Sequence, residues 1–278
     1  MFSFRNRLWP LAAGLLALAF LPPRAAVAVE SDWVDAGHAR VRLLADSGGD
    51  GLRAGVEIKL ENGWHTYWRY PGDAGVPPHF DWSASENLDS VSVKWPAPEI
   101  FAADGGIKSV GYNGHVTFPV EIKRTDVGQP IQLKLKLDFA VCEKLCVPAT
   151  AAVSLEVPLE SGDLSETLEQ AESSVPRSAT LGQGGALSVE SIRIEHGDKP
   201  RAIISVKAPA DAAPELLAEG PDDKWALPLP EKIGEEDGLT RFALPFEGAP
   251  PGAKPIPPKL VVTLKAANDA VQTEIPLE

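Results

Sequence analysis

The chain has 278 residues, of which 44% are hydrophobic and 23% are charged, so it can build one large core or two ordinary ones. Its formal net charge is -13, and an acidic chain repels phosphate backbones, which excludes nucleic acid as an expected partner. Proline (26) and glycine (24) are frequent, a pattern typical of many short strands joined by turns.

Residues 1–28 have the layout of a secretory signal peptide. Arg5 and Arg7 precede an apolar run from Leu8 to Leu21, and Ala26-Val27-Ala28 is a small-residue cleavage site. A permanent membrane anchor is the alternative, but the run is shorter than the about 20 residues that a span requires. We expect an exported mature chain that begins near Val29 and does not insert into the membrane after cleavage.

Residues 29–160 are predicted to form an antiparallel β-sandwich. Apolar residues alternate with polar ones in four segments, as in strands with one buried face: 56–60, 116–120, 131–139 and 153–159. Glycine, proline, asparagine and aspartate separate these segments, which indicates tight connections between neighbouring strands.

Residues 161–185 are predicted to be a helical linker. Asp163 can cap the start of a helix, with Glu166 three residues later, and Leu164, Leu168 and Ala171 would share one face. Pro176 ends this pattern, and glycines 182, 184 and 185 predict a flexible joint.

A second, smaller β-rich domain is predicted over residues 186–278. Its strand candidates are residues 189–194, 202–206 and 260–264. This region has no cysteine, and its role is open between a spacer and a docking surface.

Cys142 and Cys146 are the two cysteines of the chain, and they fall at the turn of a predicted hairpin. In an oxidising compartment they should pair. A structural bridge that closes so short a loop stabilises little, whereas a close pair suits reversible exchange. A metal site with His65 or His115 is the third option, disfavoured because Met1 is the sole methionine and a second cysteine pair is lacking. The residues alone leave the first two readings open.

Several separated motifs resemble the N-terminal periplasmic domain of the DsbD/ScsB family of transmembrane disulfide reductases. They span roughly residues 30–160 and occur in the family's order: Gly63-Trp64-His65-Thr66-Tyr67-Trp68-Arg69-Tyr70-Pro71-Gly72-Asp73-Ala74-Gly75, Trp95-Pro96-Ala97-Pro98, Gly111-Tyr112-Asn113-Gly114, Val116-Thr117-Phe118-Pro119-Val120, and the Cys142–Cys146 turn followed by Val147-Pro148-Ala149.

The resemblance implies an immunoglobulin-like sandwich that performs thiol–disulfide exchange without a cofactor. It implies that Cys146 forms the mixed disulfide with partners and that Cys142 resolves it. The implied partners are a membrane-embedded DsbD/CcdA-like electron donor and periplasmic thioredoxin-like or disulfide isomerase proteins, a setting that includes cytochrome c biogenesis. The chain would act as a stand-alone exported protein, because we see no membrane domain and no Cys-x-x-Cys after the sandwich, and its donor would act in trans.

Two features depart from the best-known family member. The cysteines are separated by three residues rather than by a longer gap. The stretch that corresponds to the family's cap loop, Glu99 to Val110, has Asp104-Gly105-Gly106 at its centre and Phe101 as its nearest aromatic residue. The sequence therefore leaves the presence of a cap open.

Six residues are expected to line the cysteine site: Trp64, His65, Tyr67, Trp68, Phe101 and Tyr112. The alternative for the tryptophans is packing between the sheets, and for His65 an ordinary hydrogen bond in a partly buried position. The rival function is a non-catalytic binding module, in which a structural disulfide fixes a loop and the aromatic face holds a glycan or a protein.

Overall fold

A computed structural model of the chain describes residues 29–47, 52–102, 106–159, 164–183 and 185–277. The predicted signal peptide, the predicted capping residue Asp163 and Gly184 lie outside these residues. Within them, no helix is long and apolar enough to cross a membrane.

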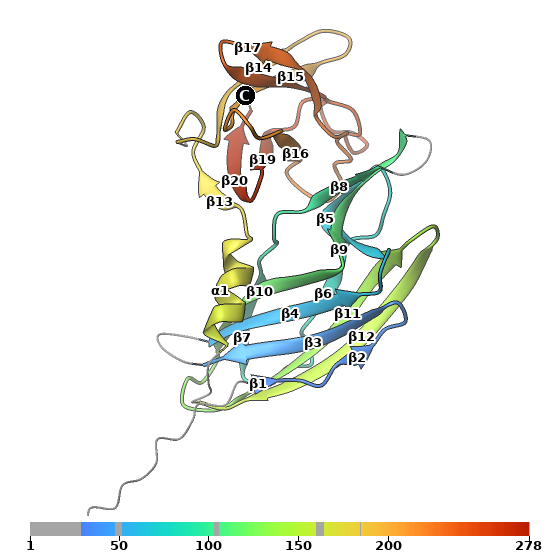
Figure 1. Cartoon of the computed structure of the whole chain (residues 1–278), viewed down its shortest axis with the longest axis vertical. Helices are drawn as coiled ribbons and strands as arrows, with labels where there is room; N and C mark the ends of the chain where they lie inside the picture. Colours follow the sequence, from blue (N-terminus) through green and yellow to red (C-terminus); the bar gives the residue numbers. More distant parts are fainter. Residues whose placement is uncertain (1–28, 48–51, 103–105, 160–163, 184, 278) are drawn as a thin grey trace, which may run out of the picture.

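The first sandwich consists of two antiparallel sheets packed face to face (Figure 1). One sheet has the order β1-β3-β4-β10-β7, with β2 also paired to β3. Its strands are β1 (Val29–Glu30), β2 (Val34–Asp35), β3 (Ala39–Asp46), β4 (Leu52–Leu60), β7 (Leu88–Val93) and β10 (His115–Arg124).

The other sheet of the first sandwich carries both cysteines. Its order is β12-β11-β5-β9-β8, with β6 also paired to β11. Its strands are β5 (His65–Gly72), β6 (His79–Asp81), β8 (Glu99–Ala102), β9 (Lys108–Asn113), β11 (Ile131–Cys142) and β12 (Cys146–Val157).

On β11 and β12, the residues predicted to be apolar and inward-facing are buried in the structure, and the polar residues between them are more exposed. Leu133, Leu135 and Leu137 are buried, while Lys136 between them is exposed. Leu135 lies opposite Val153 in the antiparallel register, so apolar side chains of both strands face the same core. Each such fully buried side chain stabilises the fold by about 1.5–3 kcal/mol.

Helix α1 (Ser165–Ser173) packs on the first sandwich instead of standing free in a joint. Leu164 and Leu168 form a buried cluster with Leu44 of β3. Gly55 on β4 makes room for the helix, because a Cβ there would lie 3.1 Å from a methyl carbon of Leu168. The helix is therefore attached to the first sheet through its apolar face.

The second sandwich is smaller and packs two four-stranded sheets over its own apolar core (Figure 1). One sheet has the order β13-β20-β19-β16, with β13 (Arg177–Ala179), β16 (Glu215–Glu219), β19 (Lys259–Ala266) and β20 (Asp269–Pro276). The other has the order β14-β15-β18-β17, with β14 (Ser188–Glu195), β15 (Arg201–Lys207), β17 (Glu231–Glu236) and β18 (Leu239–Pro245). The predicted all-β fold class is confirmed, with the second β-rich region present.

Candidate functional site

The cysteines close the hairpin of β11 and β12. The two strands pair from Ile131 opposite Val157 to Cys142 opposite Cys146, and Glu143 to Leu145 form the turn. The sulfurs are joined in a disulfide with the Cα atoms 4.2 Å apart. A pair held opposite each other at a hairpin end can close and reopen without moving the strands.

Strand β5 brings a tyrosine to both sulfurs. His65 lies opposite Cys142 in the register, so the side chains of His65, Tyr67 and Cys142 share the outer face of the sheet. The Tyr67 hydroxyl oxygen lies 2.8 Å from Cys142 Sγ and 3.1 Å from Cys146 Sγ. Because neither sulfur of a disulfide carries a hydrogen, the hydroxyl is the donor.

The Tyr67 ring has a fixed position because it is buried against Gly75. Tyr67 is 2% exposed and packs with Ala140 and Cys142. Gly75 has a φ of +141°, and a Cβ there would lie 2.4 Å from the tyrosine ring. Only glycine fits this approach. Sequence reasoning missed Gly75, because nothing local signals a contact with a ring eight positions earlier.

The two sulfurs differ in access. Cys142 is 3% exposed, whereas Cys146 is exposed and follows Leu145, whose side chain is 78% exposed. An incoming thiolate must reach a sulfur along the axis of the bond that breaks, so access decides which sulfur reacts. Cys146 is therefore the more exposed residue of the pair.

Burial keeps the side chains of Tyr67 and His65 beside the disulfide neutral. It raises the pKa of the Tyr67 hydroxyl, which stays protonated and able to donate. Burial also lowers the pKa of His65, so its imidazole is neutral near pH 7. The site presents one hydrogen-bond donor to sulfur and no fixed charge from these two side chains.

The hairpin of β8 and β9 borders the site through Phe101. The Phe101 ring stacks on His65 with centroids 4.9 Å apart, and His65 meets the Tyr67 ring edge-on at 5.5 Å. Trp64 and His65 also line, with Phe101, a pocket of about 380 Å³. Phe101 thus belongs to the surroundings of the disulfide, although residues 103–105 of this hairpin lie outside the described structure.

Two of the six expected lining residues, Trp68 and Tyr112, point elsewhere, and Trp64 stands at the edge of the site. Trp68 alternates with Tyr67 and is fully buried in the core between the sheets. Tyr112 faces the same core, and its hydroxyl donates to the carbonyl of Pro96 at 2.9 Å. Trp64 borders the pocket but stacks on His38, with ring centroids 3.7 Å apart. The structure brings His65, Tyr67 and Phe101 together beside the cysteines.

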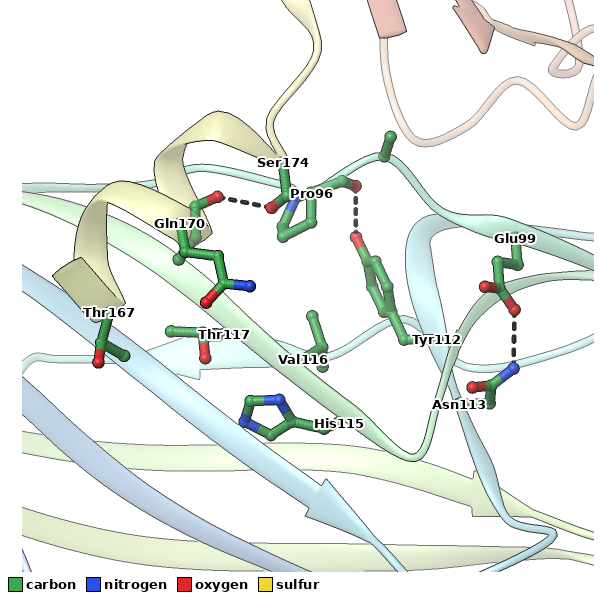
Figure 2. A pocket seen from close by; sticks show the side chains of 12 residues that line it. Pro96, Glu99, Tyr112, Asn113, His115, Val116, Thr117, Thr167, Gln170 and Ser174 are labelled. Atoms are coloured by element: carbon green, nitrogen blue, oxygen red, sulfur yellow. Dashed lines mark hydrogen bonds between the residues drawn. The ribbon is translucent and has the colours of Figure 1, made fainter. Parts of the chain in front are cut away.

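His115, the other histidine considered for a metal site, lies on the sheet without the cysteines. Its Nε2 atom is 2.6 Å from Glu57 Oε1. It lines a pocket of about 320 Å³, across which Gln170 and Thr167 of α1 face β10 (Figure 2). Among the residues that the structure describes, no three histidine, cysteine or acidic side chains cluster as metal ligands.

Comparisons with known proteins agree with this geometry. Residues 30–158 match the sequence model of the family described as the N-terminal domain of thiol:disulfide interchange protein DsbD. No curated protein sequence gives a significant match. The crystal structure of the N-terminal periplasmic domain of ScsB from Proteus mirabilis matches with a TM-score of 0.68 at 22% identity.

That match covers 89% of this chain and 98% of the ScsB domain. The shared fold therefore extends beyond residues 30–158 into the second sandwich. The family resemblance seen in the sequence is confirmed, because residues 30–158 of this chain match the sequence model of the DsbD N-terminal domain family.

Proposed function

We propose that this chain performs periplasmic thiol–disulfide exchange, relaying two electrons through Cys142 and Cys146. The observation that carries the proposal is a disulfide with one buried and one exposed sulfur, both within hydrogen-bond distance of the Tyr67 hydroxyl. The match of residues 30–158 to the DsbD N-terminal domain family and the likeness to the ScsB domain support the same chemistry.

The proposed exchange has two steps. In the reduced protein, the Cys146 thiolate attacks one sulfur of a partner disulfide, a mixed disulfide forms, and the partner's other sulfur leaves as a thiolate. The Cys142 thiolate then attacks Cys146 Sγ, which breaks the mixed disulfide and restores the Cys142–Cys146 bond. The partner gains two electrons and, once its thiolates are protonated, two protons. A membrane-embedded DsbD/CcdA-like donor would reduce the pair again by the same steps in reverse.

The Tyr67 hydroxyl can assist both the oxidation and the reduction of the cysteine pair in this scheme. When either sulfur leaves as a thiolate, the neutral hydroxyl can donate a hydrogen bond to the negative charge. A hydrogen bond to a charged group is stronger than one to a neutral group, so the contact favours the thiolate and lowers its pKa. Thioredoxin-like or disulfide isomerase proteins of the periplasm are the proposed acceptors.

The rival is a binding module with a structural disulfide. A bridge that closes three intervening residues is expected to stabilise by about 2 kcal/mol or less, which is a weak structural reason for it. The reduction potential separates the two functions, because structural bridges lie below about -300 mV and relay pairs lie nearer their partners.

The decisive experiment replaces each cysteine by alanine in the full chain. Cys142→Ala leaves the exposed Cys146 able to form a mixed disulfide that nothing resolves, so adducts with periplasmic redox proteins should accumulate in cells. Cys146→Ala leaves only the buried thiol and should trap far fewer. Both are measured on non-reducing gels followed by identification of the trapped partners.

The relay is rejected if neither variant traps a partner; the structural bridge of the rival then accounts for a loss of up to about 2 kcal/mol of stability in each variant. Equal trapping by both variants would keep the relay but reject Cys146 as the partner-facing cysteine.

A further inference from the structure

An arginine near the end of β5 ties the first sandwich to the second. Arg69 lies two positions after Tyr67, and its Nε and Nη2 atoms donate to the two carboxylate oxygens of Glu219 at 2.8 and 2.7 Å. Nη2 also donates to Gln272 Oε1 at 2.8 Å. The side chains of Arg69 and Glu219 are 24% and 16% exposed, so solvent screens this bidentate pair only in part.

Further contacts fix the same region. The Tyr70 hydroxyl donates to the carbonyl of Leu227, and Lys265 Nζ donates to the carbonyl of Pro98 at 3.1 Å. Leu217 and Leu229 of the second sandwich belong to the core cluster of the first. In Figure 1 the edge that carries β16 and β19 faces β5 and β8.

The contacts of Arg69 and Tyr70 are made by the part of β5 in which the regular backbone pairing with β9 is interrupted. The regular register with β9 ends at Tyr67 opposite Gly111 and shifts before Gly72 opposite Ser109. Arg69 and Tyr70 lie inside this interruption. A strand without regular ladder bonds keeps one position only if other contacts fix it, and the second sandwich supplies them.

We propose that Arg69 is a positioning residue of the disulfide site, through which the second sandwich holds β5 and thereby the Tyr67 hydroxyl against the two sulfurs. This proposal rests on the proposed thiol–disulfide exchange. It gives residues 186–278 a part in that exchange, which the family match over residues 30–158 does not cover.

Geometry makes the coupling effective. Hydrogen bonds weaken steeply as distance and angle depart from the optimum, so a small shift of β5 removes much of the bond from Tyr67 to sulfur. The bidentate arginine–carboxylate pair is directional and resists such a shift better than a single hydrogen bond does.

The test compares Arg69→Gln and Glu219→Gln with Arg177→Gln in the full mature chain. Arg177 also pairs with an acidic residue, because its Nη2 atom donates to both carboxylate oxygens of Asp269, but that pair is exposed and lies within the second sandwich. Reduction of the disulfide by dithiothreitol should slow by about three- to tenfold in the first two variants, the effect of one lost hydrogen bond, and stay unchanged in the third. The pH dependence of alkylation of the reduced protein by iodoacetamide should show a raised pKa of the reactive thiol in the same two variants.

A double-mutant cycle separates positioning from mere stability. Tyr67→Phe should slow reduction by itself, and adding Arg69→Gln should slow it little further, because both changes remove the same bond. Rates and thiol pKa equal to wild type in the variants of Arg69 and Glu219, or additive effects in the cycle, overturn the proposal even if the unfolding temperature falls. If Arg69→Gln does not fold, Glu219→Gln decides, since its amide keeps one acceptor for Arg69.

The wild-type protein tells the two proposals apart. A wild-type disulfide that resists dithiothreitol rejects thiol–disulfide exchange and, with it, the positioning role. A reactive wild type with unaffected Arg69 and Glu219 variants rejects the positioning role alone.

Discussion

The two sandwiches have the same construction but differ at the ends of their hairpins. In the first, the hairpin of β11 and β12 ends in a disulfide beside a buried tyrosine. In the second, the hairpin of β19 and β20 pairs up to Ala266 opposite Asp269 and ends in the tight turn of Ala267 and Asn268. The same scaffold thus carries chemistry in one case and a plain connection in the other, because the reactive groups sit at strand ends and leave the core unchanged.

The sandwiches also differ in the apolar contacts that each makes with other parts of the chain. The core of the first includes Leu217 and Leu229 from the second, and α1 covers Leu44 on its outer face. The cluster of buried side chains in the second contains residues from 187 onward. The first sandwich therefore depends on apolar contacts with the rest of the chain. The contribution of these contacts to its stability can be measured.

Shortening the chain should give the largest effect. A fragment of residues 29–160 is predicted to fold cooperatively, but to be less stable than a fragment of residues 29–176 by about 3–6 kcal/mol, because it loses the burial of Leu164 and Leu168. Urea unfolding followed by tryptophan fluorescence measures the difference. Equal stabilities would mean that α1 adds nothing to the first sandwich, and an aggregated shorter fragment would place the boundary of the folding unit beyond residue 160.

Two glycines allow a matched test of the two sandwiches. A Cβ on Gly111 would lie 1.9 Å from the carbonyl oxygen of Thr66, and a Cβ on Gly248 would lie 2.0 Å from that of Ala226. Gly111→Ala and Gly248→Ala should each destabilise by about 2 kcal/mol or more, since a backbone must move in both. Only Gly111→Ala should also change the rate of disulfide reduction, because Thr66 precedes Tyr67 on β5. Gly197→Ala meets nothing within 4 Å but has a φ of +143°, so it measures the cost of backbone strain without a clash in the second sandwich.

Acid should weaken the first sandwich through Glu57. Burial alone would raise the pKa of this carboxyl, but hydrogen bonds from His115 and Arg42 outweigh burial and lower it. A folded pKa below the unfolded one stabilises the fold at neutral pH, and this contribution is lost as the pH falls through the folded pKa. Glu57→Gln should therefore flatten the loss of stability that begins as the pH falls below the ordinary glutamate pKa of 4.5.

Glu195 in the second sandwich gives the matched comparison. The hydrogen bond from Arg201 lowers its pKa as well, but the Glu195 side chain is 29% exposed, against 9% for Glu57, so solvent and salt screen its pairs more. Glu195→Gln should change the acid limb of the stability curve less than Glu57→Gln does. An equal change in both variants would contradict the importance of burial for Glu57.

The smallest predicted effect is the titration of His65. Because burial lowers its pKa, its imidazole signals in nuclear magnetic resonance should titrate below the ordinary histidine range. Phe101→Ala uncovers the ring and should raise this pKa toward the ordinary value without unfolding the protein. An unchanged pKa in the variant would show that Phe101 does not shield His65 in solution.

The sequence by itself determined the strands and the place of the cysteines. Alternation with a period of two is local, so residues 131–139 and 153–159 revealed both their strand character and their buried face, and the hairpin between them placed Cys142 and Cys146 at its end. The family motifs then identified the immunoglobulin-like sandwich.

Only the tertiary structure decided which aromatic residues meet the disulfide and what holds them there. Residues 64–70 carry aromatic side chains at both parities, so alternation could not tell Tyr67 at the sulfurs from Trp68 in the core. Helix α1 shows a polar and an apolar face in sequence, but not the surface of β3 and β4 that receives it. Arg69 and Glu219 are 150 positions apart, and a pair so distant is set by the docking of two folded sandwiches, which no local pattern encodes.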